Sequence, residues 1–193
     1  NALNETNNVY ALNLNETISV ANANTLNGKT TGVITATITA GNYAAVNALN
    51  GTGNAYAVTV NDQITVAEAD VLAAKTTGVV TATLSTGDMA TLAGLNETGN
   101  AYTITITDTS ATAAALTALD AKTTVAVQAG NVTSLSGTAT EVKAAYAADA
   151  ATTIVLDGDE AVSVSGSVSV ADANIIAGKT SGVVTASIAS GTY

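Results

Sequence analysis

The chain repeats itself about every 46 residues, and this period constrains the fold more than any other feature. Three tyrosines mark the period at equal intervals of 46 residues: Tyr10, Tyr56 and Tyr102. A Lys-Thr-Thr or Lys-Thr-Ser tripeptide recurs within each period, beginning at Lys29, Lys75, Lys122 and Lys179. Periods of this length are typical of solenoids, propellers and tandem arrays, in which each repeat buries its apolar face against its neighbours.

We expect a single repeat array over residues 1–193, with copies at 1–46, 47–93, 94–140 and 141–193. The last two marker lysines are 57 residues apart instead of 46 or 47, so the last copy carries an insertion, between Val125 and Val170, and is cut short. Segments 18–43 and 168–193 are identical at 15 of 26 positions, and segments 18–43 and 64–89 at 14 of 26. Distant copies are therefore as similar as neighbouring ones.

Each period is predicted to hold two coils of about 22 and 24 residues, each with a strand and a short helix. Strict alternation over residues 56–61 places Tyr56, Val58 and Val60 on one face of a strand. A helix is expected over residues 66–75, where Val66, Ala69 and Leu72 share one side. We expect Gly32 and Gly78 to end such helices, since glycine tolerates a left-handed cap.

These coils predict a repeat solenoid of parallel strand–turn–short helix units, similar in layout to leucine-rich repeats. The 40 alanines suit helices that lie close to a sheet. The alternative is an all-β solenoid, in which the helical segments are only corners, because the 34 threonines also favour strands. A propeller has a comparable period, but too few turn-bounded strands are visible in each repeat.

The composition argues against an enzyme. Phe, Trp, Pro, Cys, His and Arg are all absent. Acyl-transfer triads normally need a histidine base, and zinc and copper sites depend on histidine and cysteine. We therefore predict no catalytic residue and no cofactor.

The charge and hydropathy pattern also narrows the choice of partners. Five lysines stand against fifteen Asp and Glu, giving a net charge of −10 that would repel nucleic-acid phosphates and an anionic membrane surface. The longest apolar runs are a few residues, against about 20 needed to span a bilayer. We predict no nucleic-acid binding and no membrane insertion.

The outward face of the predicted strands is rich in threonine. If Ile and Val point inward, an exposed ladder is formed by Thr35, Thr37, Thr39, Thr59, Thr81, Thr83, Thr103, Thr105 and Thr107. The simplest interpretation is that threonine is a strand former that tolerates water. Two functional alternatives remain open: an ice-binding surface that orders water, or a flat face that docks against another solenoid.

Two further groups of residues are candidates for chemistry. Asp157, Asp159 and Glu160 follow a predicted strand and offer oxygen ligands to calcium, but no calcium-loop spacing is present and a solvated turn is the preferred interpretation. The marker lysines Lys29, Lys75, Lys122 and Lys179 are expected to close helices, where a cation favours the negative end of the dipole. A reactive role for these lysines is the alternative.

Five Asn-x-Thr triplets would accept glycans in a secreted protein: Asn4, Asn15, Asn50, Asn96 and Asn131. Such triplets also arise by chance in a chain rich in Asn and Thr.

The two ends of the sequence are nearly in phase with each other. Residues 1–4 correspond to residues 47–50, and residues 191–193 correspond to residues 41–43. Neither end carries an atypical polar cap, which solenoids ordinarily need for solubility. We therefore expect the array to continue, either covalently or by head-to-tail stacking of copies.

A resemblance supports this expectation. Residues 118–124 (ALDAKTT) and 132–146 (VTSLSGTATEVKAAY) resemble tandem Ala/Thr/Asn/Gly-rich repeats of very large secreted or cell-surface proteins of marine cyanobacteria and related bacteria. The resemblance implies an extracellular or cell-surface structural role and carries over no catalytic residue. The leading hypothesis is thus a solenoid segment of a filament, sheath or giant surface fibre. The alternative is an adhesin-like or ice-binding module that uses the threonine face.

Overall fold

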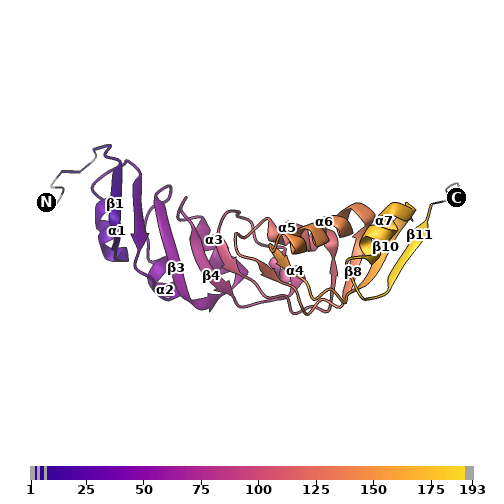
Figure 1. The fold of residues 1–193 in the computed structure, drawn as a ribbon. Helices are drawn as coiled ribbons and strands as arrows, with labels where there is room; N and C mark the ends of the chain where they lie inside the picture. Colours follow the sequence, from indigo (N-terminus) through magenta and orange to yellow (C-terminus); the bar gives the residue numbers. More distant parts are fainter. Residues whose placement is uncertain (1–2, 4, 7, 190–193) are drawn as a thin grey trace. The chain divides into compact units, whose positions relative to one another are not determined.

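Most strands are followed by a helix in the computed structural model, which describes residues 3, 5–6 and 8–189 (Figure 1). The chain divides into two compact units. Unit 1 comprises Asn1–Ser85 with Leu95–Thr103, and unit 2 comprises Thr86–Gly94 with Ile104–Tyr193.

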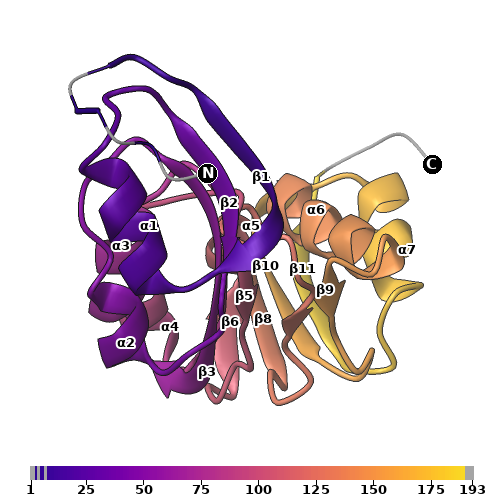
Figure 2. The same cartoon turned by 90° about the vertical axis from the view of Figure 1, so that its left-hand side faces the viewer.

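Unit 1 is a five-stranded parallel sheet whose strand order follows the chain. Its strands are β1 (Leu12–Ile18), β2 (Ile34–Ile38), β3 (Ala55–Ile64), β4 (Val80–Leu84) and β5 (Ala101–Thr103). Its helices are α1 (Val20–Asn27), α2 (Tyr43–Asn47) and α3 (Val66–Ala73). All three helices lie on the same face of the sheet (Figure 2). Each strand is thus followed by a crossover to the next parallel strand, as βαβ units require.

The period-two pattern of the sequence explains the sheet. In β2, Ile34, Ala36 and Ile38 are buried while the two intervening threonines are exposed, and β4 has the same pattern. Tyr56, Val58 and Val60 of β3 are also buried on one face, as predicted. One face of each strand therefore supplies the core, and the other faces water.

Side-chain caps begin the helices of unit 1. The Ser19 hydroxyl accepts from the Asn22 N–H at the start of α1. At α3, Thr65 and Glu68 form a reciprocal capping box, with each side chain accepting from the other's backbone N–H. Such caps satisfy donors that the first helical turn leaves unpaired.

Unit 2 contains two parallel sheets. The larger has the order β11–β10–β8–β6 and the smaller is the pair β7–β9. The strands are β6 (Ser110–Thr112), β7 (Val127–Gln128), β8 (Ser134–Thr138), β9 (Ile154–Val155), β10 (Ala161–Val168) and β11 (Val184–Ile188). The helices are α4 (Met89–Leu92), α5 (Ala113–Asp120), α6 (Ala139–Ala150) and α7 (Val170–Ala177).

The alternating α/β layout with parallel sheets is confirmed, and the all-β alternative is wrong. Helices α2, α3, α4 and α5 occupy the segments that the alternative treated as corners. The helices begin at capping side chains and bury an apolar stripe, so they are more than bends of the chain.

Unit 2 departs from the simple two-coil pattern. After β7 the chain turns through Gly130 and Asn131, residue types that favour turns, and enters β8 without an intervening helix. Helix α6 has 12 residues, against eight in α5 and α7, and lies between Val125 and Val170, where the sequence predicts the insertion. The predicted strand over residues 102–107 also ends early, at Thr103, where the division between the units falls.

Candidate functional site

A buried threonine joins neighbouring coils of unit 1. The hydroxyl of Thr76, directly after the marker Lys75, donates to the carbonyls of Asn54 and Tyr56. It accepts from the N–H groups of Tyr56, at 2.8 Å, and of Gly78, at 2.9 Å. One side chain therefore fastens the turn after α3 to the start of β3, about 20 residues earlier in the chain.

This threonine clamp recurs after Lys29 and, with fewer bonds, after Lys179. Thr30 bonds to Asn8 and Tyr10 as Thr76 bonds to Asn54 and Tyr56. In unit 2, the Thr180 hydroxyl donates to the Glu160 carbonyl and accepts from the Gly182 N–H. The Thr123 hydroxyl accepts from the Val125 N–H. Sequence reasoning recognised the tripeptide only as a marker and missed this contact.

The glycine of this turn is needed for close approach, so the prediction that Gly32 and Gly78 end helices is wrong. Helix α1 ends at Asn27 and α3 at Ala73, several residues earlier. A β-carbon at Gly78 would lie 2.3 Å from the Tyr56 carbonyl oxygen, and one at Gly32 would lie 2.4 Å from that of Tyr10. The turn thus presses against the neighbouring strand, and only glycine fits there.

A buried asparagine makes a second clamp, two residues before the marker tyrosine. The Asn54 side-chain oxygen accepts from the Ile34 N–H at 2.8 Å, at the start of β2. The Asn100 side-chain oxygen accepts from the Val80 N–H at 2.9 Å, at the start of β4. Both asparagines are buried, and each supplies a hydrogen-bond acceptor to a buried backbone N–H of the preceding strand.

An aspartate from the following coil holds the start of each short helix. The Asp62 carboxylate accepts from the Tyr43 N–H of α2 at 2.9 Å. One 46-residue period later in the sequence, the Asp108 carboxylate accepts from the Met89 N–H of α4 at 2.6 Å. These contacts again link consecutive coils of the same unit.

The marker tyrosines differ in how deeply they are buried. Tyr56 and Tyr102 are 1% and 0% exposed, whereas Tyr10 is 43% exposed. The Tyr102 hydroxyl donates to the Ala69 carbonyl of α3 at 3.4 Å. Burial, followed by the nearby charges of Asp70 and Glu97, raises the pKa of Tyr102 to about 12. Burial also raises the pKa of Tyr56.

The first and last coils expose apolar side chains that are buried elsewhere in the repeat. Ile188 of β11 is 50% exposed, while its equivalents Ile38 and Leu84 are 2% and 5% exposed. Tyr10, just before β1, is 43% exposed, while its equivalents Tyr56 and Tyr102 are 1% and 0% exposed. β1 and β11 are also edge strands of their sheets. Unpaired edges of this kind are sites for pairing with another chain.

All nine predicted ladder threonines are exposed. Seven belong to unit 1, and Thr105 and Thr107 belong to unit 2. Within unit 1, Thr59 pairs with Thr81 and Thr83 pairs with Thr103, but Ala55, Ala57 and Ala101 stand opposite threonines in the neighbouring registers. The hydroxyl rows are therefore interrupted.

The acidic residues at 157–160 differ in exposure. Glu160 is fully buried, and its carboxylate accepts from the Tyr146 hydroxyl at 3.1 Å and from the Gly158 N–H at 3.0 Å. Asp157 and Asp159 are exposed. Among the described residues, no group of three or more carboxylates is gathered as a metal site would need.

The marker lysines lie just beyond the helix ends. Each backbone N–H donates to the last helical turn, at Leu26, Leu72, Leu119 and Ile176 for Lys29, Lys75, Lys122 and Lys179 respectively. The Lys75 ammonium also donates to the Leu49 carbonyl at 2.9 Å, in the loop after α2. This lysine therefore adds another link between coils.

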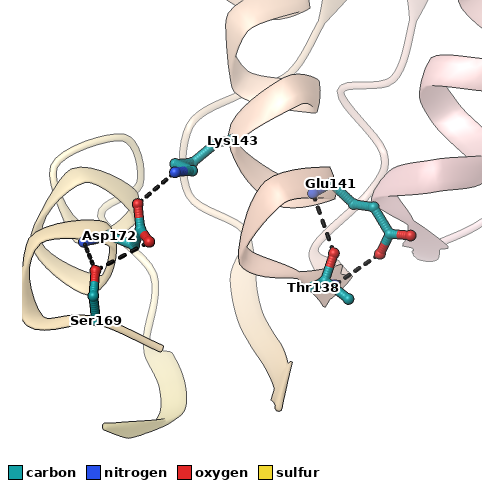
Figure 3. Close-up of polar contacts among 5 residues, drawn as sticks. All are labelled: Thr138, Glu141, Lys143, Ser169 and Asp172. Carbon is teal, nitrogen blue, oxygen red and sulfur yellow. Dashed lines mark hydrogen bonds and ion pairs between the residues drawn. The ribbon is translucent and has the colours of Figure 1, made fainter. Parts of the chain in front are cut away.

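In unit 2, side chains link α6 to α7. Figure 3 shows Lys143 of α6 in an ion pair with Asp172 of α7, whose carboxylate also accepts from the Ser169 hydroxyl. The hydrogen bond from Lys143, and then that from Ser169, lowers the pKa of Asp172. The same view shows the capping box of Thr138 and Glu141 at the start of α6.

Four of the five predicted glycan acceptors, Asn15, Asn50, Asn96 and Asn131, are exposed. The side-chain amide of Asn96 donates to Asp70, and that of Asn131 donates to the Ile106 carbonyl. Asn4 lies outside the described residues, as do most of the terminal residues on which the predicted phase match depends.

The buried polar side chains described above thus mainly form hydrogen bonds between consecutive coils. No protein-family model, curated protein or solved structure matches the chain. Within the part of the chain that the structure describes, no helix has the length and apolar character to cross a bilayer.

Proposed function

We propose that this chain is a non-enzymatic structural protein, in which each unit is a length of parallel α/β solenoid. It would serve as a segment of an extracellular filament, sheath or giant surface fibre that stacks end to end. The observation that carries this proposal is the exposure, at β11 and just before β1, of apolar positions that are buried in the other coils. The side chains at these positions would be buried, as their equivalents are, if another coil packed against them.

The clamps between coils support the same function. Thr30, Thr76 and Thr180 each bond to the coil before their own, and Asn54 and Asn100 do the same. Because these contacts join nearest neighbours only, a further coil can be added without change to the rest. A fibre needs this property, whereas an enzyme needs convergent reactive groups.

An extracellular or cell-surface location fits the exposed Asn-x-Thr triplets, the lack of cysteine and the resemblance to bacterial surface repeats. A chain without thiols is insensitive to the redox state of its surroundings. Its charge of −10 would keep a long fibre soluble.

Electron microscopy of the chain at high concentration, with its mass measured alongside, tests the proposal. We expect fibres from the 18.8 kDa chain. Compact single particles at every concentration would contradict end-to-end stacking by non-covalent contacts. In material from the native source, denaturation to 18.8 kDa subunits would indicate separate copies, and a much longer polypeptide would indicate a covalent array.

The exposed threonine face supports a second candidate, an adhesin-like or ice-binding module. The interruptions of its rows by Ala55, Ala57 and Ala101 count against a regular water-ordering lattice. A freezing-point hysteresis assay decides: hysteresis that a Thr37→Ala, Thr81→Ala double variant abolishes would favour ice binding.

A further inference from the structure

We propose that two copies of the chain join through a specific parallel strand register, in which β11 of one copy pairs with residues 9–11 of the next. Thr185 would lie opposite Val9, Ala186 opposite Tyr10, and Ser187 opposite Ala11. This inference rests on the proposed end-to-end assembly and specifies the surface that makes it.

The register is taken from two interfaces inside unit 1. Strand β2 pairs with β3 so that Thr35, Ala36 and Thr37 lie opposite Ala55, Tyr56 and Ala57. One period later, β4 pairs with β5 so that Thr81, Ala82 and Thr83 lie opposite Ala101, Tyr102 and Thr103. In both interfaces an alanine of the Thr-Ala-Thr strand faces the marker tyrosine.

Strand β11 has the sequence of the first partner in these interfaces. Its residues 184–188 read VTASI, against ITATI in β2 and VTATL in β4. Residues 8–11, NVYA, have the sequence of the second partner, against NAYA at 54–57 and NAYT at 100–103. The two edges are therefore the two halves of an interface that the chain already forms twice.

Burial distinguishes these edges from the internal copies. Val184, Ala186 and Ile188 are all more exposed than their equivalents in β2 and β4, which are buried. Tyr10 is exposed, whereas Tyr56 and Tyr102 are buried. Pairing in the proposed register would cover both sets of side chains at once.

Two polar contacts would recur across the new interface. The Asn8 side-chain oxygen would accept from the Val184 N–H, as that of Asn54 accepts from Ile34 and that of Asn100 from Val80. The Tyr10 hydroxyl would donate to the Ala173 carbonyl of α7, as that of Tyr102 donates to Ala69 of α3 in the β4–β5 interface, whereas the buried Tyr56 hydroxyl of the β2–β3 interface has no hydrogen-bond partner among the described residues. Ala173 is partly exposed, whereas Ala69 is buried.

Charge sets the conditions for assembly. Each copy carries −10, so copies repel one another in dilute buffer. Salt screens this repulsion, with a Debye length of about 3 Å at 1 M against about 10 Å at 0.1 M. Association is therefore expected to strengthen as the salt concentration rises.

Disulfide cross-linking between two single-cysteine chains tests the register, because the natural chain has no cysteine. A tagged Val9→Cys chain is mixed with an untagged Thr185→Cys chain and oxidised. Paired positions on parallel strands lie about 5 Å apart, within reach of a disulfide. The matched control is Ser187→Cys, on the same face but two residues along, about 8 Å from Val9 and beyond that reach.

We expect the 9–185 pair to form the mixed dimer at least about tenfold faster than the 9–187 pair, as the disulfide distance limit implies. Association in sedimentation velocity without this preference would overturn the register and leave end-to-end assembly standing. If the unmodified chain does not associate at any salt or protein concentration, both the register and non-covalent end-to-end stacking are wrong, and the denaturation test on native material then decides the covalent array separately.

Substitution of Tyr10 supplies an independent readout. Tyr10→Asp should weaken association by a factor of ten or more without changing the thermal unfolding of the chain, since Tyr10 is exposed in the isolated copy. Tyr10→Phe should retain association. Val71→Asp is the matched control, because Val71 is also 43% exposed and lies on α3, away from both edges. Equal weakening by Tyr10→Asp and Val71→Asp would contradict the proposal.

Discussion

The phenol of Tyr146 in α6 donates a hydrogen bond to the carboxylate of Glu160, 3.1 Å away, and this carboxylate is entirely buried. The other carboxylate oxygen accepts from the Gly158 N–H at 3.0 Å. Burial, followed by the charge of Glu160, raises the pKa of Tyr146 well above its usual range. A buried acid thus fixes the loop before β10 against α6, where a sequence analysis expects either a solvated turn or a cation site.

Tyr146→Phe should destabilise unit 2 by about 2 kcal/mol, because it leaves a buried carboxylate oxygen without its donor. Urea unfolding followed by circular dichroism measures the loss. Tyr43→Phe is the control, since Tyr43 is partly exposed and its hydroxyl is not part of a clamp. In a double-mutant cycle with Glu160→Gln, a coupling energy near zero would contradict a direct interaction.

Gly78→Ala should destabilise unit 1 by about 2–4 kcal/mol, as expected when a new side chain forces backbone to move. The added β-carbon would lie 2.3 Å from the Tyr56 carbonyl oxygen. Gly28→Ala is the matched control, because its φ is −76°, its nearest neighbour would be 3.5 Å away, and the next repeat has Ala74 at the same place. Hydrogen exchange of the β3 and β4 amides reports on unit 1, and equal effects of the two substitutions would show that Gly78 is not a contact point.

Gly78 shows which features of the fold can be predicted from the sequence and which cannot. The period, the alternation in β2 and β4, and the helices after them follow from local patterns, because the side-chain spacing of a strand or helix is a local property. The role of Gly78 depends on Tyr56, which lies 22 residues away in sequence and is brought close only by the parallel pairing of β3 with β4. A cap and a close approach need the same residue, so the sequence alone does not separate them.

The residues of the polar clamps recur at constant positions of the repeat, but the sequence analysis assigned them no structural role. Asn54 and Asn100 precede the marker tyrosines by two residues, and Thr76 follows a marker lysine. A polar residue that recurs at one phase of an otherwise apolar coil indicates a buried hydrogen bond, and this signal could have identified the clamps. The second sheet of unit 2 had no such signal, because β7 and β9 are only two residues long.

Thr76→Val should destabilise unit 1 by about 2–3 kcal/mol, because it keeps the shape of the side chain but removes a buried hydroxyl that shares its proton between two carbonyls and accepts from two N–H groups. Thr76→Ser restores the hydroxyl and should recover most of the loss. Thr59→Val, on the exposed face of β3, is the control and should change stability by less than about 0.5 kcal/mol. If valine is tolerated equally at positions 76 and 59, the hydroxyl of Thr76 does not hold the coils together. Urea midpoints of the four proteins make the comparison.

Alkaline pH should destabilise unit 1 through Tyr102. Its pKa is about 12 in the folded chain, against an ordinary value of 10.0, so the folded chain keeps a proton that the unfolded chain has released. The contribution is therefore complete below pH 10 and is lost as the pH rises toward 12, because unfolding then releases a proton. Between pH 9 and 11.5, the free energy of unfolding of Tyr102→Phe should fall by about 2 kcal/mol less than that of the natural chain. This value follows from the pKa difference of about two between the folded and unfolded chain. Tyr43→Phe is the control for the loss of a phenol from a less buried position. Equal alkaline losses in the natural chain and in Tyr102→Phe, measured by urea unfolding at both pH values, would mean that Tyr102 titrates as it does in the unfolded chain.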